Sequence, residues 1–237
     1  MNDYFTFKGI SCATCGIVVT ELPEIILAAE RVTFTDVPGR SGSLTSLEGT
    51  DVYADITYTI QCYVDDTSNV ANIAKFFKGS GKLVLPNRPG GYYEGRVINQ
   101  IPFEKILRGN APRSFAVNFR LKPFFHLDSG DTSVSIPTSG TTLTNPTGFI
   151  SKPLITIVGS GDIGFLVGSQ VMALTGITSG VTLDSESGEA YYTSNNVTTS
   201  MNDKVAGDFP VFSPGNNAIS WSGTVTSVSV IPRWVTL

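Results

Sequence analysis

Three cysteines and a single histidine are the residues of this chain best suited to metal binding or redox chemistry. Cys12 and Cys15 form a CxxC pair, while Cys62 and His126 lie far along the sequence. A structural zinc site needs four ligands, so both distant residues would have to join the pair. A redox CxxC motif would begin a helix, whereas the residues after Cys15 resemble a strand. We therefore expect reduced thiols in a buried or interface loop, with no metal and no cofactor.

Hydrolytic chemistry has few candidates in this sequence. His126 is the one possible base for a serine or cysteine nucleophile, and no GxSxG motif accompanies it. Glycoside hydrolysis needs only two carboxylates. The candidates by residue type all lie at strand ends or in turns, where acidic residues are ordinary: Asp162, Asp184, Glu186, Glu189 and Asp208. We predict that the protein has no catalytic residues and is not an enzyme.

Two glycine-containing segments superficially resemble ligand-binding loops. The segment GSGDIG at 159–164 is not followed by the lysine and helix of a phosphate-binding loop. The segment DSESGE at 184–189 has only part of the carboxylate spacing of a calcium loop. Both are interpreted as turns between strands.

Aromatic side chains leave carbohydrate binding open as an alternative function, because sugar rings stack on exposed aromatic faces. The possible platforms are Tyr191, Tyr192, Trp221 and Trp234. Strand alternation places Ile219 and Trp221 on the same face, which favours core packing for that tryptophan. A free carbohydrate-binding protein would need the rings exposed.

The first half of the chain predicts a sheet with one helix. Residues 53–64 alternate apolar and polar side chains, as do 31–37, 92–98 and 114–121. Asp65 or Asp66 is expected to cap a helix whose apolar stripe is Val70, Ile73, Ala74 and Phe77, ending before Gly79. Turns are expected at 38–43 and at 87–91. The first of these is interpreted as a loop that projects from the sheet, with Arg40 at its tip.

The second half predicts strands alone. Short strand patterns recur every eight to twelve residues from Lys152 onward, separated by turns that contain Gly, Asn and Ser, as in a β-sandwich or jelly roll. The predicted fold class is all-β with one short helix. The expected domains are 1–128, a β-sandwich or barrel-like unit, and 151–237, a β-sandwich, with a linker and first strands at 129–150.

Charge is distributed unevenly along the chain. Of the 16 Lys/Arg and 20 Asp/Glu residues, 13 and 13 lie in 1–128, which leaves 3 and 7 in 129–237. The net charge of −4 argues against nucleic-acid recognition through a basic surface. No apolar run approaches the roughly 20 residues of a membrane helix, and the N-terminus lacks the layout of a signal peptide. We expect a protein that is folded in a cytosol and does not insert into membranes.

Several segments resemble, in order, the distal tail proteins of long-tailed bacteriophages. In the first half they are FKGISCATCGIVVTELP, VPGRSGSL, KFFKGSGKLVL, YYEGRVINQIPFEKILR and FAVNFRLKPFF. In the second half they are NPTGFISKPLITIVGSGDIGFLVG, GVTLDSESGEAYY, GDFPVFSPGNNAISWSGTV and SVIPRWVTL. The resemblance covers essentially the whole chain, although Cys12 and Cys15 replace the small or polar residues expected there.

This resemblance implies a structural protein of the virion tail tip, made in the bacterial cytoplasm. Its first domain would form a homo-hexameric ring around a lumen that passes the tape-measure protein and the genome, and its second would be a galectin-like sandwich. The implied partners are the tail-tube protein, the tail-associated tip protein and, in many relatives, receptor-binding proteins. A tail-tube protein is a competing structural reading, against which the galectin-like half counts. We expect ring or partner contacts at two turns, through Pro38, Gly39 and Arg40, and through Asn87, Arg88 and Pro89.

Overall fold

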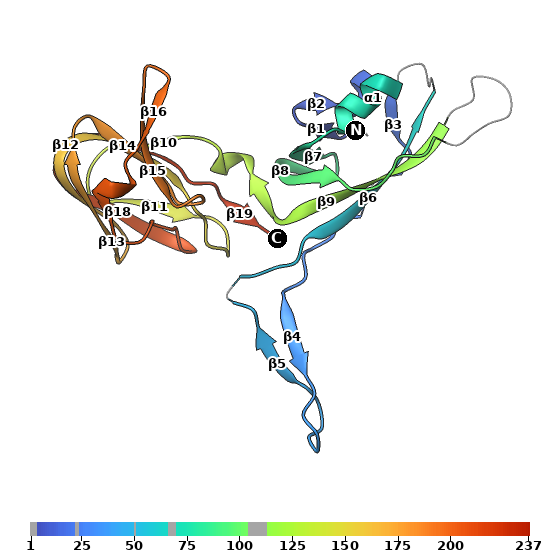
Figure 1. The fold of residues 1–237 in the computed structure, drawn as a ribbon, viewed down its shortest axis with the longest axis horizontal. Coiled ribbons are helices and arrows are strands. Elements are labelled where there is room, and N and C mark those ends of the chain that lie inside the picture. The colour runs from blue at the N-terminus through green and yellow to red at the C-terminus, as the bar shows by residue number, and fades with distance from the viewer. Residues whose placement is uncertain (1–3, 22–23, 50, 66–69, 104–112) are drawn as a thin grey trace. The chain divides into compact units, whose positions relative to one another are not determined.

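The computed structural model describes residues 4–21, 24–49, 51–65, 70–103 and 113–237. The chain divides into two compact units, Met1–Phe125 with Leu237, and His126–Thr236 (Figure 1). The described part is mostly strand with one α-helix, which confirms the predicted fold class. No helix among the described residues is long and apolar enough to cross a membrane.

The first unit is built on a curled, half-barrel sheet. Its strand order is β2-β1-β7-β8-β9-β6-β3. The strands are β1 (Thr6–Phe7), β2 (Ile10–Ser11), β3 (Ile17–Val19), β6 (Ile56–Val64), β7 (Ser80–Leu85), β8 (Arg88–Val97) and β9 (Arg113–Leu127). A 3-10 helix, η1 (Cys12–Cys15), follows β2. The predicted turn at 87–91 is wrong in its position, because the turn is at Pro86 and Asn87 and β8 begins at Arg88.

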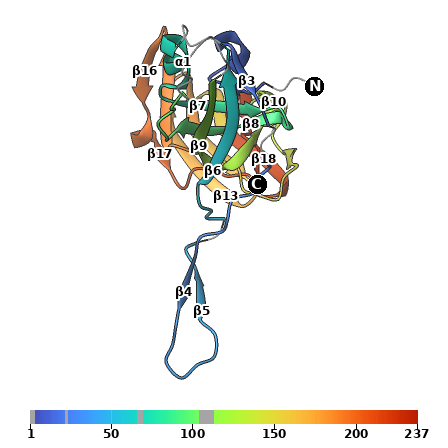
Figure 2. The ribbon, with the colours of Figure 1, turned by 90° about the vertical axis from the view of Figure 1, so that its right-hand side faces the viewer.

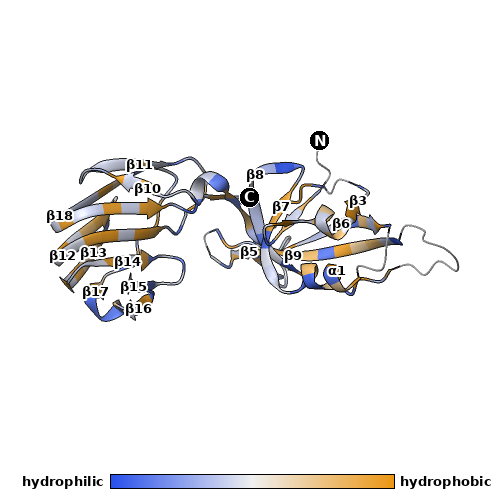
Figure 3. Cartoon of the chain, turned by 90° about the horizontal axis from the view of Figure 1, so that it is seen from above, coloured by the Kyte–Doolittle hydropathy of each residue, from blue (hydrophilic) through white to orange (hydrophobic). Residues whose placement is uncertain are grey.

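Strand alternation sets the two faces of this sheet. Along β6, Ile56, Tyr58, Ile60 and Cys62 are buried and the residues between them face outward, as the sequence predicted. β9 repeats the pattern beside β6, with Ile60 opposite Val117 and Tyr58 opposite Phe119. Figure 3 shows the same alternation of hydrophobic and hydrophilic residues along β9. One face of the sheet is therefore apolar and the other polar.

The apolar face is covered by aromatic side chains and by α1 (Val70–Phe77). The ring of Phe119 lies 5.9 Å from that of Phe5, 5.3 Å from that of Phe7 and 6.3 Å from that of Phe77. The helix buries Ile73, Phe76 and Phe77, whereas Val70 and Ala74 are exposed, so the predicted stripe was half wrong. The helix packs through its last turn, where two adjacent phenylalanines reach the core. Of the two proposed caps, Asp66 lies outside the described residues.

The end of α1 is fixed by two features of the sequence. Gly79 follows the helix with φ 90°, a left-handed conformation that glycine adopts without steric cost. Lys8 Nζ donates to the carbonyl of Lys78 at 2.7 Å and so satisfies one of the last carbonyls of the helix. The predicted C-terminal stop is confirmed.

A separate two-stranded ribbon interrupts the first unit between β3 and β6. It consists of β4 (Val32–Thr35) and β5 (Leu44–Leu47), which pair with each other and with no other strand among the described residues (Figures 1 and 2). Its base is closed by backbone hydrogen bonds from Arg31 N to Val52 O and from Ala54 N to Ala29 O. The expected loop at 38–43 is the tip of this ribbon.

The second unit contains a nine-stranded sheet whose main order is β10-β18-β12-β14-β15-β16. The strands are β10 (Val134–Ile136), β11 (Thr141–Asn145), β12 (Leu154–Val167), β13 (Gln170–Ile177), β14 (Gly180–Asp184), β15 (Glu189–Ser194), β16 (Val197–Ser200), β17 (Val205–Ala206) and β18 (Gly215–Ile231). β19 (Val235–Thr236) ends the chain, and 3-10 helices occupy Asp128–Gly130 and Asn202–Lys204. β10 and β11 lie within the range 129–150 predicted to hold a linker and first strands, and both pair with β18.

Two long strands, β12 and β18, organise this unit. The sequence patterns predicted shorter strands in place of each. Residues 159–164 were interpreted as a turn but continue β12, with a register shift between Gly161 and Ile163. β18 is 17 residues long, whereas the sequence predicted only short strands in this half. β12 pairs with β18, β13 and β14. Register shifts occur at these glycines, but the strands continue through them, so turn composition alone was misleading.

Candidate functional site

The ribbon tip holds three of the residues predicted to make contacts. Pro38, Gly39 and Arg40 are all exposed, and Arg40 N donates to the carbonyl of Val37 at 3.1 Å. Gly39 has φ 81°, which suits the tight reversal there. The tip is therefore an exposed loop, as the sequence predicted, and its contact with another molecule stays a prediction.

One face of the ribbon is unexpectedly apolar. Val32 is paired with Leu47, and Phe34 with Thr45, so these four side chains share a face. Phe34 is 66% exposed and Leu47 57% exposed. A two-stranded hairpin with an uncovered apolar face is marginally stable in water, and such a surface ordinarily marks an interaction site.

The second group of predicted contact residues is arranged differently. Arg88 donates to the Tyr93 hydroxyl and, through Nη2, to an oxygen of Leu237 at 2.6 Å. Its guanidinium also lies 4.1 Å from the centre of the Phe125 ring. The Arg88 side chain thus makes its contacts within the first unit. Asn87 is half-buried, with its side-chain oxygen Oδ1 shielded from solvent, and only Pro89 is exposed.

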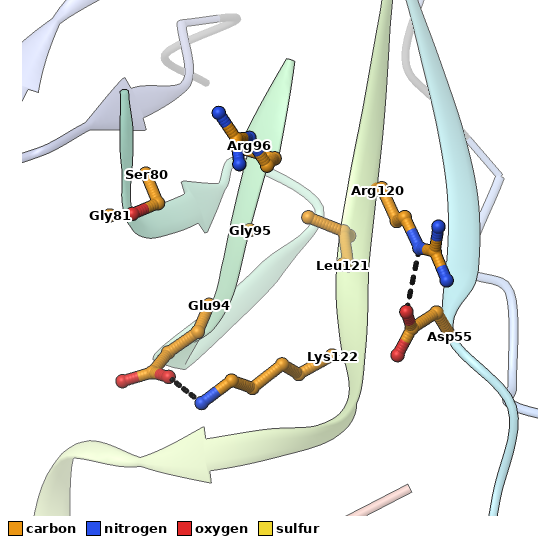
Figure 4. Close-up of a pocket in the computed structure, with 9 residues that line it drawn as sticks. All are labelled: Asp55, Ser80, Gly81, Glu94, Gly95, Arg96, Arg120, Leu121 and Lys122. Carbon is orange, nitrogen blue, oxygen red and sulfur yellow. Dashed lines mark hydrogen bonds and ion pairs between the residues drawn. The ribbon is translucent and has the colours of Figure 1, made fainter. Parts of the chain in front are cut away.

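A shallow depression of about 490 Å³ lies on the polar face of the sheet (Figure 4). Arg120 Nε lies 2.7 Å from Asp55 Oδ2, and Lys122 Nζ lies 2.7 Å from Glu94 Oε2. Arg96 extends from β8 beside them. Each ion pair has both partners more than one-third exposed, so the pairs set the charge of the surface more than they stabilise the fold.

The four aromatic residues proposed as a sugar platform do not form an open surface together. Trp234 is 5% exposed and packs on Phe212, with 5.6 Å between ring centroids. Trp221 lies opposite the buried Phe165 and packs against the core, as does Tyr192. Tyr191 is half-buried on β15. The core packing expected for Trp221 is confirmed, and no cluster of exposed rings is formed by these four.

Among the carboxylates considered for catalysis, those whose contacts are described hold turns and the C-terminal segment in place. Arg233 donates to both oxygens of Asp184, at 2.6 and 3.1 Å, and lies 3.5 Å from Glu186. The hydrogen bond from Arg233 holds the pKa of Asp184 below its usual value. Asp162 accepts from Gly176 N at 2.9 Å. The turn at 184–189 is confirmed, and its acidic residues fasten the turn to the end of the chain.

The cysteines are free and buried, which agrees with the expected reduced thiols. Burial raises the pKa of Cys12 to about 11 and that of Cys62 to about 12. Thiols in this state are weak nucleophiles. Within the described ranges, no group of three or more His, Cys, Asp or Glu side chains is arranged to hold a metal ion.

Sequence reasoning missed the apolar ribbon face and the charged sheet face. Alternation along 114–121 could show that Arg120 faces away from Phe119, but it could not show that this face stays uncovered. The ribbon pairing gives Phe34 and Leu47 a common face, and this depends on the register across the tip. A hairpin centred on the turn at Gly39 and Arg40 would have predicted this register, because residues equally far from the turn pair with each other.

Comparisons with known proteins give a fold. No family model matches this chain, and no curated protein matches it in sequence. The crystal structure of SPP1 Dit (gp 19.1), described as a paradigm of the hub adsorption apparatus in phages that infect Gram-positive bacteria, is similar with a TM-score of 0.75. The identity is 12%, and 99% of each chain is covered.

Chains of the phage p2 baseplate in its activated conformation are also similar. With strontium the TM-score is 0.53 at 6% identity, covering 95% of this chain and 96% of that one. With calcium the TM-score is 0.54 at 6% identity, covering 96% of each. The chain thus has the fold of Dit-like phage proteins over essentially its whole length.

Proposed function

We propose that this protein is a structural subunit of a phage tail tip: a hexameric hub that joins the tail tube to the tip protein and the host-adsorption apparatus. The observation that carries the proposal is the match to SPP1 Dit over 99% of both chains, which extends through both units and not through a common sheet alone.

The ribbon supports assembly with further copies of the same chain. A closed ring needs two different patches that meet on neighbouring subunits. The face of Val32, Phe34 and Leu47 supplies one patch, because its apolar side chains gain free energy when a neighbour covers them. The tip at Pro38, Gly39 and Arg40 extends this patch. We assign the ribbon to the contact between subunits.

The polar face of the sheet is assigned to the lumen of the ring. Along β6 its outward residues Thr57, Thr59 and Gln61 are exposed, whereas the opposite face is closed by α1 and the phenylalanine core. A passage for an extended polymer needs a hydrated, weakly adhesive wall. Uncharged hydroxyl and amide groups beside paired charges provide such a wall.

Light scattering of the purified protein across a concentration series tests the assembly. We expect a species of six times 25.3 kDa, or a concentration-dependent rise toward it. A strict monomer at every concentration and at two ionic strengths would contradict self-assembly, and a glycan-binding screen would then test the carbohydrate alternative.

Two variants test the role of the ribbon. The double variant Phe34→Ser with Leu47→Ser should raise the protein concentration needed for assembly at least tenfold. It should leave the fold intact, because both side chains are already solvent-exposed in the single chain. Leu44→Ser is the matched control, since Leu44 is 44% exposed and lies on the opposite face of the ribbon. Equal loss of assembly in both would contradict the assignment of this face.

A further inference from the structure

The polar face of the first sheet carries basic side chains on adjacent strands. Arg120 and Lys122 lie on β9, Arg96 on β8 and Lys82 on β7. Neighbouring strands are about 4.8 Å apart, so these four form one basic group. A cluster of Lys and Arg on one face of a domain is ordinarily the footprint of a site for nucleic acid.

Carboxylates on the same face oppose this group. Asp55 holds Arg120 and Glu94 holds Lys122, both at 2.7 Å (Figure 4). Glu94 is also the cross-strand neighbour of Lys82. Each of the two basic residues on β9 is therefore in contact with one carboxylate.

Further acidic residues balance the remaining cations. Glu21 and Glu24 line a second depression together with Thr57, Thr59 and Gln61, at the outward face of β6. The four acidic residues Glu21, Glu24, Asp55 and Glu94 thus equal in number the four basic residues Lys82, Arg96, Arg120 and Lys122. These eight described residues together carry no net charge.

We propose that Asp55 and Glu94 mask Arg120 and Lys122 so that double-stranded DNA passes this face without being retained. The inference rests on the proposed hub function, in which this face lines the lumen. DNA binding that is independent of sequence is driven by cations that replace counterions on phosphates. A guanidinium or ammonium already held by a carboxylate must first break that contact, so it adds little to such binding.

Fold stability is a weak alternative explanation for these pairs. Arg120 and Asp55 are 63% and 41% exposed, and Lys122 and Glu94 are 59% and 38% exposed. Exposed pairs of this kind contribute little to folding. Removal of the carboxylates should therefore change DNA retention more than it changes thermal stability.

The test is a salt series of binding to a fluorescein-labelled duplex of mixed sequence, followed by anisotropy. The variant Asp55→Asn with Glu94→Gln frees both basic residues and changes the net charge from −4 to −2. The control Glu186→Gln with Glu189→Gln makes the same change of charge in the second unit, and Glu186 likewise lies beside a cation, Arg233, at 3.5 Å. A matched control is needed because any loss of negative charge favours DNA.

We expect the first variant to bind DNA at least tenfold more tightly than the control at low salt. Its slope of log affinity against log salt should steepen by about 2, roughly one for each freed cation. Addition of Arg120→Gln and Lys122→Gln to that variant should reverse the gain. Equal binding by the variant and the control, or no reversal, would overturn the inference.

Light scattering and thermal melting of the same samples separate the two proposals. If the variant assembles as the parent does but gains no DNA binding, masking is wrong and the hub stands. If the parent stays monomeric but the variant gains DNA binding, the masking of Arg120 and Lys122 is supported and the proposed hexameric hub is wrong. If the double variant fails to fold, Glu94→Gln alone is used, and it should steepen the slope by about 1.

Discussion

The two units differ in which side chains find partners within the unit and which are left exposed. In the second unit, the buried Asn217 accepts from Ser213 N at 3.0 Å and donates to the carbonyls of Ser213 and Gly215 at 2.8 and 2.9 Å. The carboxylates of its turn at 184–189, Asp184 and Glu186, form ion pairs with Arg233. The first unit instead exposes an apolar ribbon face and a densely charged sheet face. We therefore expect the first unit to make contacts with other molecules through these two faces.

The largest expected effect separates the core of the first unit from its surface. Phe119→Ala removes a side chain that contacts Phe5, Phe7 and Phe77, and should destabilise the first unit by about 3–5 kcal/mol. Chemical denaturation of the variant should show the first unit unfolding well before the second. Phe34→Ala is the control, and it should change the free energy of unfolding of the monomer by less than about 0.5 kcal/mol. Coincident unfolding of both units would show that they are not independent.

An intermediate effect is expected at the turn that closes the second unit. Asp184→Asn removes the charge that accepts two bonds from Arg233 and should cost about 2 kcal/mol at neutral pH. The pKa of Asp184 is lower in the folded chain than in the unfolded one. Its stabilisation is therefore complete above the unfolded value of about 3.9, and it is lost as the pH falls through the folded value.

Urea denaturation of parent and variant at several pH values measures this contribution. The difference between them should be constant near neutrality and shrink in acid. Glu189→Gln, at an exposed position on the same turn, should show no such difference. A gap that grows as the pH falls would contradict the assigned role of Arg233.

The smallest expected effect concerns the thiols of the first unit. Cys12 and Cys62 should remain unlabelled by a thiol reagent at pH 8, because burial raises the pKa of Cys12 to about 11 and that of Cys62 to about 12. Urea should expose both to rapid labelling. Mass spectrometry of the labelled peptides distinguishes the two sites. Fast labelling of the folded protein would mean that this part of the first unit opens readily.

The sequence predicted local features better than distant ones. The faces of β6 followed from alternation, and the end of α1 followed from Gly79. The length of β12 did not, because Gly159 and Gly161 are typical of turns. Pairing with β18 at Gly159 and with β13 at Gly161 keeps them in a strand. The burial of Phe76 instead of Val70 depends on where the helix meets the Phe5 and Phe7 rings.

The candidate site was predictable in part for the same reason. A projecting loop at Pro38–Arg40 is a local feature and was found. Arg88 was assigned to a surface turn, but its partners Tyr93, Phe125 and Leu237 are up to 149 positions away, beyond the reach of local patterns. The charged face needed knowledge of which side of the sheet α1 covers.

The strand order of the first sheet also has a consequence for the timing of folding. β1 pairs with β7, β3 with β6, and β6 with β9, so the core closes only after Phe119 has been synthesised. Long-range pairings of this kind are slow to form. The ribbon needs only contacts between residues 29 and 54, and a hairpin forms within microseconds. On the ribosome, all the residues that pair in the ribbon are therefore present before the sheet that carries it can close.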